Sequence, residues 1–130
     1  MSLPLLLVVD DDEDIREAIE LALGPEGYRV LTAGDGADAW AFLEEGVTPN
    51  LILLDLMMPR WDGERFLTEL AASAHASIPV VVMSGHDTAA KRARALGAAE
   101  ILPKPVDLDT LLATVARYCT RQDIEVTAHP

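Results

Sequence analysis

Leu51-Ile52-Leu53-Leu54-Asp55 is the most informative segment of the chain, because four branched apolar residues in a row are followed by one carboxylate. A strand that is apolar at every position is typical of a central parallel strand, which is buried on both faces. In open α/β sheets, ligands bind just outside the carboxyl ends of such strands. The Asp55 carboxylate is therefore expected where chemistry takes place, although an Asp that only caps a turn explains this stretch alone equally well.

Residues 5–9 (LLLVV) form a second wholly apolar run, and five acidic residues follow it at positions 10–14. Carboxylates in the first turn of a helix interact favourably with the helix dipole, which accounts for residues 12–14. Asp10 and Asp11 lie at the strand end itself, where crowded like charges cost energy unless a cation is bound. Five consecutive acids also argue against a phosphate-binding loop, which needs glycines and free backbone N–H groups.

Strand-like and helix-like segments alternate along the rest of the chain. Further strands are predicted over residues 28–33, 78–83 and 98–102, and helices over about 15–23, 37–45, 63–74, 87–96 and 107–119. Five strands alternating with five helices imply an α/β fold, a doubly wound parallel sheet with helices on both faces. We expect one domain over residues 4–120 and a loose C-terminal tail over residues 121–130.

The composition is strongly acidic, with a net charge of −12, of which −11 lies in residues 1–65 (fifteen acidic, four basic). Such a surface repels phosphate backbones and anionic lipids, so binding to nucleic acid or to a membrane surface is not expected. The chain has neither a signal peptide nor an apolar run of roughly 20 residues, which predicts a cytoplasmic protein. Cys119 is the single cysteine, so an intrachain disulfide and a cysteine-based zinc site are excluded.

Polar side chains are predicted to gather at one edge of the sheet. Asp10, Asp11, Asp55 and Ser84 follow strands, and Lys104 stands between two prolines after the fifth strand. The carboxyl ends of parallel strands share one edge, and the prolines restrict the backbone around the lysine. Three neighbouring carboxylates favour a hard divalent cation, for which Mg²⁺ is the natural choice.

With these residues in view, the chain resembles a response-regulator receiver domain of two-component signalling over roughly residues 4–119. The resemblance rests on VVDD at 8–11, LLDLMMP at 53–59 with DG at 62–63, MSG at 83–85 and KP at 104–105. Each motif alone is weak, but all of them in this order and spacing are highly specific. The resemblance implies a five-stranded, flavodoxin-like sheet in the order 2-1-3-4-5.

The resemblance also implies a role for each carboxylate at the predicted edge. Asp55 matches the phosphoacceptor, while Asp10 and Asp11 match the acidic pair that holds Mg²⁺ (or Mn²⁺) together with Asp55 and the main-chain carbonyl of Met57. Ser84 and Lys104 match the hydroxyl and the lysine that contact the phosphoryl group. The implied function is a phosphorylation-controlled binding module that catalyses only its own phosphoryl transfer and dephosphorylation, and is not otherwise an enzyme.

One departure from the family bears on how the signal leaves the site. The family usually has Tyr or Phe three residues before its lysine, whereas this chain has Ile101, so an aromatic flip cannot carry the signal. Residues 87–96 have mostly alanines to bury and are expected to be weakly anchored. We therefore expect phosphorylation to draw in Ser84 and to let Ile101 repack, which changes the surface of the fourth helix, fifth strand and last helix.

The implied partners are a histidine kinase or histidine phosphotransfer protein and a downstream output protein or domain, and a phosphorylation-dependent homodimer is compatible with them. Two other functions stay open. A haloacid-type aspartyl-phosphate phosphatase would need a second Asp where Met57 stands, and the intact acceptor, acid pair and lysine argue against a scaffold that is never phosphorylated. The chain is expected to be a stand-alone receiver or part of a larger regulator.

Overall fold

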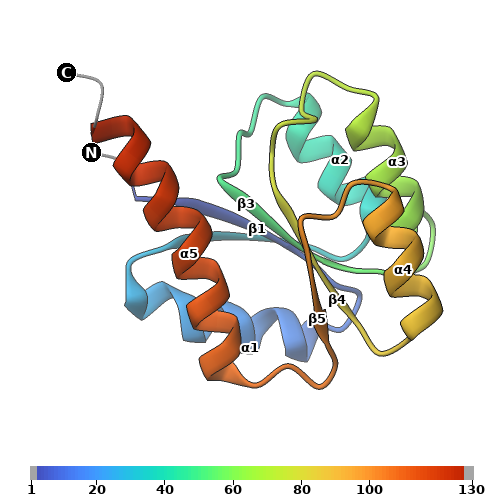
Figure 1. Cartoon of the computed structure of the whole chain (residues 1–130), viewed down its shortest axis with the longest axis horizontal. Coiled ribbons are helices and arrows are strands. Elements are labelled where there is room, and N and C mark those ends of the chain that lie inside the picture. The colour runs from blue at the N-terminus through green and yellow to red at the C-terminus, as the bar shows by residue number, and fades with distance from the viewer. Residues whose placement is uncertain (1–2, 128–130) are drawn as a thin grey trace.

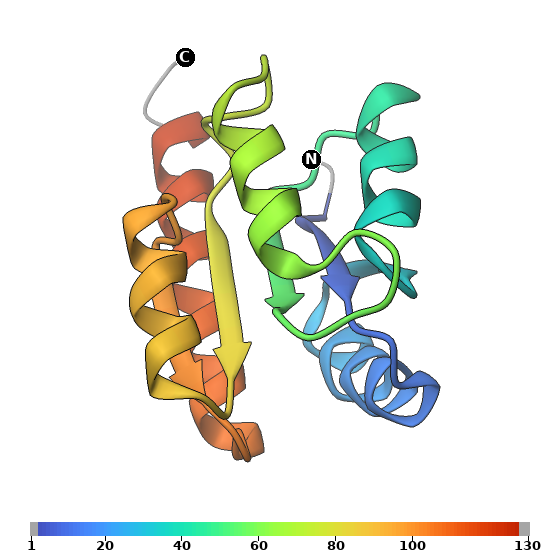
Figure 2. The same cartoon turned by 90° about the vertical axis from the view of Figure 1, so that its right-hand side faces the viewer.

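A parallel sheet lies between two layers of helices in this computed structural model (Figure 1, Figure 2), which describes residues 3–127 and the side chains of residues 3–119. Its strands are β1 (Leu5–Val9), β2 (Arg29–Ala33), β3 (Leu51–Asp55), β4 (Val80–Ser84) and β5 (Glu100–Pro103). They lie in the order β2-β1-β3-β4-β5, and every neighbouring pair is parallel. The predicted fold class and strand order are therefore confirmed.

The helices divide between the two faces of the sheet. They are α1 (Glu13–Leu23), a short 3-10 helix η1 (Gly24–Glu26), α2 (Gly36–Glu44), α3 (Gly63–Ala71), α4 (Asp87–Ala95) and α5 (Leu108–Thr127). α1 and α5 cover one face, and α2, α3 and α4 cover the other (Figure 1). Asp12 caps α1, because its Oδ1 accepts hydrogen bonds from the amides of Asp14 and Ile15 at 2.9 and 3.3 Å.

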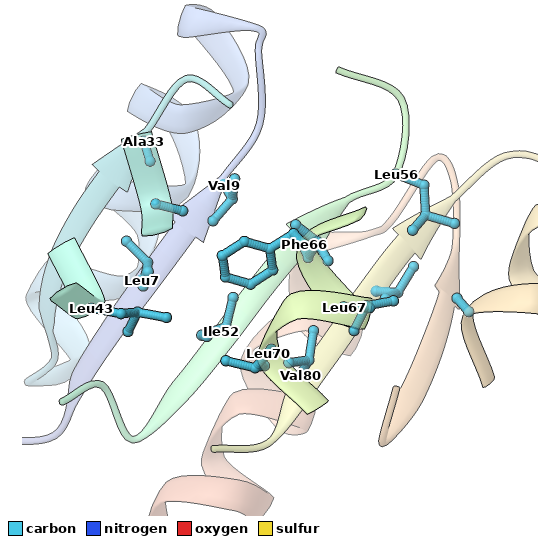
Figure 3. Packing of buried hydrophobic residues seen from close by; sticks show 14 residues of the cluster. Leu7, Val9, Ala33, Leu43, Ile52, Leu56, Phe66, Leu67, Leu70 and Val80 are labelled. Atoms are coloured by element: carbon cyan, nitrogen blue, oxygen red, sulfur yellow. The ribbon is translucent and has the colours of Figure 1, made fainter. Parts of the chain in front are cut away.

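The wholly apolar strands supply both faces of the core. Leu7 and Val9 of β1 pack beneath α2, α3 and α4, while Leu6 and Val8 pack with α1 and α5. Phe66 of α3 is fully buried in the first of these clusters (Figure 3). Burying one such side chain contributes about 1.5–3 kcal/mol. This two-sided burial explains why β1 and β3 show no alternation of apolar and polar residues.

Several predicted boundaries move by one or two residues, and α3 is shorter than predicted. The sequence predicted a helix to about residue 74, but α3 ends at Ala71. The Ser73 hydroxyl donates to the Leu70 carbonyl at 2.8 Å and accepts from the His75 amide at 3.0 Å, so side-chain bonds replace helical ones there. β4 begins after Pro79, which lacks the N–H that a ladder needs.

The C-terminal helix corrects the prediction of a loose tail from residue 121. α5 continues to Thr127, because no glycine or proline interrupts residues 107–127 and nothing in that stretch stops a helix. Residues 128–130 of the expected tail lie outside the described residues. Within residues 3–127, no helix combines the length and the apolar content needed to cross a membrane.

Candidate functional site

Three carboxylates meet where β1 and β3 end, and we call Asp10, Asp11 and Asp55 the acidic pocket. β1 and β3 are hydrogen-bonded neighbours, so their carboxyl ends lie side by side. One carboxylate oxygen from each residue lies within 4.8 Å of the other two. Asp10 and Asp55 are only 1% and 5% exposed, whereas Asp11 is open to solvent. The pocket thus has two buried carboxylates, those of Asp10 and Asp55, and one that is accessible to solvent, that of Asp11.

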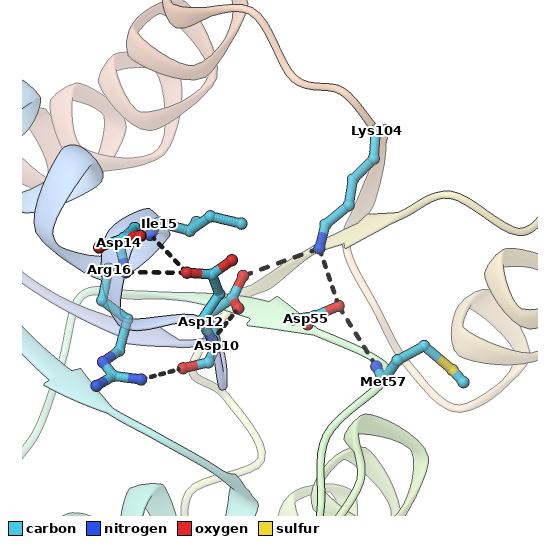
Figure 4. Close-up of polar contacts among 8 residues, drawn as sticks. All are labelled: Asp10, Asp12, Asp14, Ile15, Arg16, Asp55, Met57 and Lys104. Atoms are coloured by element: carbon cyan, nitrogen blue, oxygen red, sulfur yellow. Dashed lines mark hydrogen bonds and ion pairs between the residues drawn. The ribbon is translucent and has the colours of Figure 1, made fainter.

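Asp10 is fixed from three sides. Its amide donates to the Ala33 carbonyl at 3.1 Å. Its Oδ1 accepts from the Asp12 amide at 2.9 Å, and Arg16 Nη1 donates to its carbonyl at 2.8 Å (Figure 4). The other oxygen, Oδ2, is buried and has no hydrogen-bond partner within the described part of the chain. A buried acceptor without a partner is costly unless a ligand satisfies it.

The electrostatics of the acidic pocket favour a cation. Burial raises the pKa of Asp10 above its ordinary value, and the charges of Asp55 and Asp11 raise it further, against the Asp12 hydrogen bond and the Lys104 charge. A bound divalent cation would offset both the burial cost and the repulsion. Carboxylate oxygens are the ligands that Mg²⁺ and Mn²⁺ take in proteins. The residues present therefore fit the metal that the family resemblance implied.

Lys104 reaches into the same pocket from the loop after β5. Its Nζ lies 3.2 Å from Asp55 Oδ1 and 3.8 Å from Asp10 Oδ2 (Figure 4). Its amide donates to the carbonyl of Ser84 at 2.9 Å, which ties the loop to the end of β4. The Lys104–Pro105 peptide bond is cis. A single ammonium thus faces two carboxylates, an arrangement that leaves negative charge for a metal to neutralise.

The remaining predicted residues take different positions. The Met57 amide donates to Asp55 Oδ1 at 3.3 Å, so the main chain of Met57 adjoins the pocket while its side chain is 63% exposed. The Ser84 hydroxyl lies at the same sheet edge but bonds to His86. Ile101 is half-buried in β5 and packs against the core under α2, α3 and α4. The structure therefore brings the acids, Lys104 and the Met57 main chain together.

Sequence reasoning missed the polar contacts of three residues, Arg16, Arg60 and Asp35. Arg16 holds the main chain of Asp10, and Arg60 pairs with Asp35 at the start of α2. An Asp immediately before a helix signals an N-cap, and Asp35 does accept from the Asp38 amide at 2.9 Å. Nothing in the sequence around Arg60 signals a partner 25 residues earlier in the chain.

Comparison with known proteins agrees with this geometry. Residues 6–116 match the family model of the response regulator receiver domain. The chain belongs to this family. The receiver domain is 35% identical over 122 residues to the response regulator MprA of Mycobacterium ulcerans, covering 92% of this chain and 52% of the relative. MprA of Mycobacterium sp. strain KMS is 37% identical over 118 residues, covering 89% and 50%. This receiver domain thus spans about half the length of these curated relatives.

Solved structures of receiver proteins have the same fold as this chain. The receiver domain of Francisella response regulator 1452 has 28% identity and a TM-score of 0.84, covering 92% of this chain and 98% of that one. Vibrio cholerae chemotaxis protein CheY4 has 28% identity and a TM-score of 0.82, covering 90% and 99%. The resemblance read from the sequence motifs is therefore confirmed for both family and fold.

Proposed function

We propose that this receiver domain accepts a phosphoryl group on Asp55 from a histidine kinase or a histidine phosphotransfer protein, with Mg²⁺ held in the acidic pocket. The observation that carries the proposal is the ammonium of Lys104, 3.2 Å from Asp55 Oδ1 beside two further carboxylates. A fixed positive charge at this point suits the oxygens of a transferred phosphoryl group. This chain covers only about half of its curated relatives, so their partners cannot be assigned to it directly. The phosphoryl donor and the output partner are therefore proposals.

In the proposed step, an oxygen of Asp55 forms a bond to phosphorus while the P–N bond of the phosphohistidine breaks. The leaving imidazole keeps the electron pair of that bond. Asp10, Asp11, Asp55 and the main-chain carbonyl of Met57 would hold the metal. When bound, Mg²⁺ supplies the charge neutralisation that lets a dianionic phosphoryl group approach carboxylates. Lys104 orients the phosphoryl oxygens, and attack of water on the acyl phosphate later restores Asp55.

We further propose that the domain is not an enzyme for any separate substrate. A haloacid-type phosphatase would place a second carboxylic acid two residues after the nucleophile, as a general acid. Met57 occupies that position, and its thioether carries no proton to donate. A scaffold that is never phosphorylated would have no need for a lysine aimed at a crowded acidic pocket.

The proposed output is a change of partner binding at the surface formed by α4, β5 and α5. The partner is an output protein or domain, or a second copy of the chain in a phosphorylation-dependent homodimer. The net charge of −12 favours neither nucleic acid nor a membrane surface as a direct partner. Membership of the family supports a cytoplasmic location.

Chemical phosphorylation followed by intact mass tests the proposal. Acetyl phosphate with Mg²⁺ is expected to add one phosphoryl group to the wild-type chain and none to Asp55→Asn. The matched control is Asp109→Asn, the same substitution at an exposed position in the first turn of α5, which should be labelled like the wild type. Labelling of Asp55→Asn at the wild-type level would overturn the assignment of Asp55.

A further inference from the structure

The side chain of Arg60 ties the loop between β3 and α3, residues 56–62, to the start of α2. Arg60 Nε lies 2.5 Å from Asp35 Oδ2, and its Nη2 lies 3.0 Å from Asp35 Oδ1 and 2.8 Å from Asp38 Oδ1. Two parallel bonds between a guanidinium and a carboxylate fix orientation as well as distance. The side chain of Asp35 is 8% exposed, so this contact has a buried, well-defined end.

Asp35 is held in its charged form at this position. Burial raises its pKa, but the hydrogen bonds from Arg60 and from the Asp38 amide more than offset that effect, so the pKa of Asp35 lies below its ordinary value. Asp35 also caps α2, which connects the Arg60 contact to a rigid helix. The Arg60 contact therefore joins the loop to the N-terminus of a helix that packs on the sheet.

The backbone of Arg60 is in a conformation that its residue type rarely adopts. Its φ is +57°, and it is the one non-glycine residue with positive φ in the described part of the chain. Residues other than glycine are uncommon in the left-handed region, because Cβ crowds the following carbonyl oxygen there. Such a conformation persists only where the surroundings impose it, and it gathers at functional sites.

A second contact presses the same loop against α2. The Gly36 amide donates to the Trp61 carbonyl at 3.0 Å, and a Cβ added at Gly36 would lie 2.6 Å from the Cβ of Trp61. The Trp61 ring packs on Trp40 of α2, with ring centroids 5.7 Å apart. The first turn of α2 thus accommodates the loop only because residue 36 has no side chain.

This loop also carries the residue that adjoins the acidic pocket. Met57 donates its amide to Asp55 Oδ1 at 3.3 Å, three residues before Arg60. The Gly63 amide donates to the Leu56 carbonyl at 3.0 Å and closes the loop at its far end. Between those two anchors, the Arg60 contact is the ion pair that fixes where the middle of the loop lies.

We propose that Arg60 is a positioning residue, whose contacts with Asp35 and Asp38 hold the main chain of Met57 against Asp55 and so set the divalent-cation affinity of the acidic pocket and its rate of phosphorylation. This inference rests on the proposed function of Asp55. The functional coupling runs from the start of α2, through Arg60 and the loop, to the Asp55 carboxylate.

The variant Arg60→Gly tests the proposal most cleanly, because glycine adopts the positive φ without strain while the guanidinium is lost. Mn²⁺ binding, followed by the electron paramagnetic resonance signal of the free ion, should weaken roughly tenfold or more, as for other residues that support metal ligands. Labelling by acetyl phosphate at a fixed, subsaturating Mg²⁺ concentration should slow in step. The melting temperature without metal should fall, because the largely buried Asp35 carboxylate loses its ion-pair partner. Mn²⁺ binding is therefore compared at a temperature where circular dichroism shows both proteins folded, which separates positioning from a general loss of stability.

An effect of charge alone would change the cation affinity of Arg60→Gly in the opposite direction. Removing a positive charge from an acidic surface should strengthen cation binding, whereas loss of positioning weakens it. Arg65→Ala is the matched control, since Arg65 lies over the Trp61 ring at 4.1 Å, carries the same charge and makes no contact with Asp35 in the described structure. Its Mn²⁺ affinity should equal or slightly exceed that of the wild type.

Three further variants locate the effect in the Arg60–Asp35 pair. Asp35→Asn keeps a helix cap but removes the charge. The double variant with Arg60→Gly should lose less affinity than the two single losses combined, because both act on one contact. Arg60→Lys keeps the charge without the paired geometry and should fall between wild type and Arg60→Gly.

The outcomes separate the two proposals. If Arg60→Gly binds Mn²⁺ as tightly as the wild type, or more tightly, Arg60 has no positioning role. If the wild type binds Mn²⁺ and Arg60→Gly binds it weakly, but neither is phosphorylated, the positioning of the cation site stands and the function proposed for Asp55 falls.

Discussion

The hydroxyl of Ser84 is bonded to both main-chain groups of His86, donating to its carbonyl at 3.2 Å and accepting from its amide at 3.1 Å. His86 is the N-cap residue of α4, immediately before Asp87. α4 buries one residue, Ala93, and Arg92 pairs with Glu64 on α3. If Ser84 turns toward a phosphoryl group on Asp55, it leaves both bonds, and a lightly anchored helix is directly affected.

Hydrogen exchange should therefore report the switch in the segment that begins at Ser84. Comparing the Mg²⁺-bound protein with its beryllofluoride complex, we expect protection over residues 84–105 to change far more than protection over residues 37–45 in α2. A coupling of 1 to about 3 kcal/mol between site and surface is typical of such two-state changes. Ile101 is the side chain proposed to repack, since no aromatic is present at that position.

Ser84→Ala serves as the control for this route. The variant should bind beryllofluoride at Asp55 but lose most of the distant protection change. An undiminished change over 84–105 in Ser84→Ala, or a wild-type change confined to the neighbours of Asp55, would contradict the role given to the hydroxyl.

Mg²⁺ should stabilise the folded chain because the acidic pocket is assembled only on folding. At a hundredfold excess over its dissociation constant, a ligand bound only by the native state adds about 2.7 kcal/mol to the free energy of unfolding. Asp11→Asn removes the solvent-open carboxylate of the pocket and should shrink the gain in melting temperature. A melting temperature indifferent to millimolar Mg²⁺ at constant ionic strength would count against the metal site.

Glu100 on β5 predicts a pH dependence of stability away from the site. Its carboxylate accepts hydrogen bonds from Arg117 at 2.8 Å and from the Tyr118 hydroxyl at 3.1 Å. The Arg117 bond, with Tyr118 adding, lowers the pKa of Glu100 below its ordinary value of 4.5 against the effect of partial burial. Because the folded-state pKa is the lower one, the stabilisation is complete above the unfolded pKa and disappears as the pH falls through the folded pKa.

Thermal unfolding of Glu100→Gln across pH measures this contribution. The variant should melt below the wild type near neutral pH, and the gap should close as the pH falls below about 4.5, the ordinary pKa of the carboxyl group. Glu69→Gln, the same substitution at an exposed position of α3, is the matched control and should change the melting temperature little. A difference in melting temperature that grows as the pH falls would mean that folding raises the pKa of Glu100 instead of lowering it.

The core beneath α3 depends on one aromatic side chain. Phe66 is fully buried, so Phe66→Ala should lower the free energy of unfolding by about 3–5 kcal/mol through lost burial and the cavity left behind. Leu21 of α1 is 68% exposed, and Leu21→Ala should change it by less than about 0.5 kcal/mol. Urea titrations of the two variants, with unchanged slopes, would give both values directly.

The sequence was sufficient to predict features that depend only on the kinds of residues within one continuous segment. β1 and β3 were recognisable because they are apolar at every position, and their carboxylates meet because parallel strands end at one edge. The contact of Arg60 with Asp35 was not predictable, since it depends on how two distant loops approach each other. The continuation of α5 past residue 120 was missed because the stretch lacks an apolar period, although it contains no helix breaker.

Asp55 is proposed to carry the phosphoryl group, and this assignment can be checked by locating the acyl phosphate in the chain. Borohydride reduces an aspartyl phosphate to the alcohol, releasing phosphate and leaving homoserine, so the modified position can be read by peptide mass spectrometry. After treatment with acetyl phosphate and Mg²⁺, we expect homoserine at position 55 and unchanged Asp10 and Asp11. Homoserine at position 10 or 11, or at neither these positions nor 55 while the intact mass shows a phosphoryl group, would contradict the account.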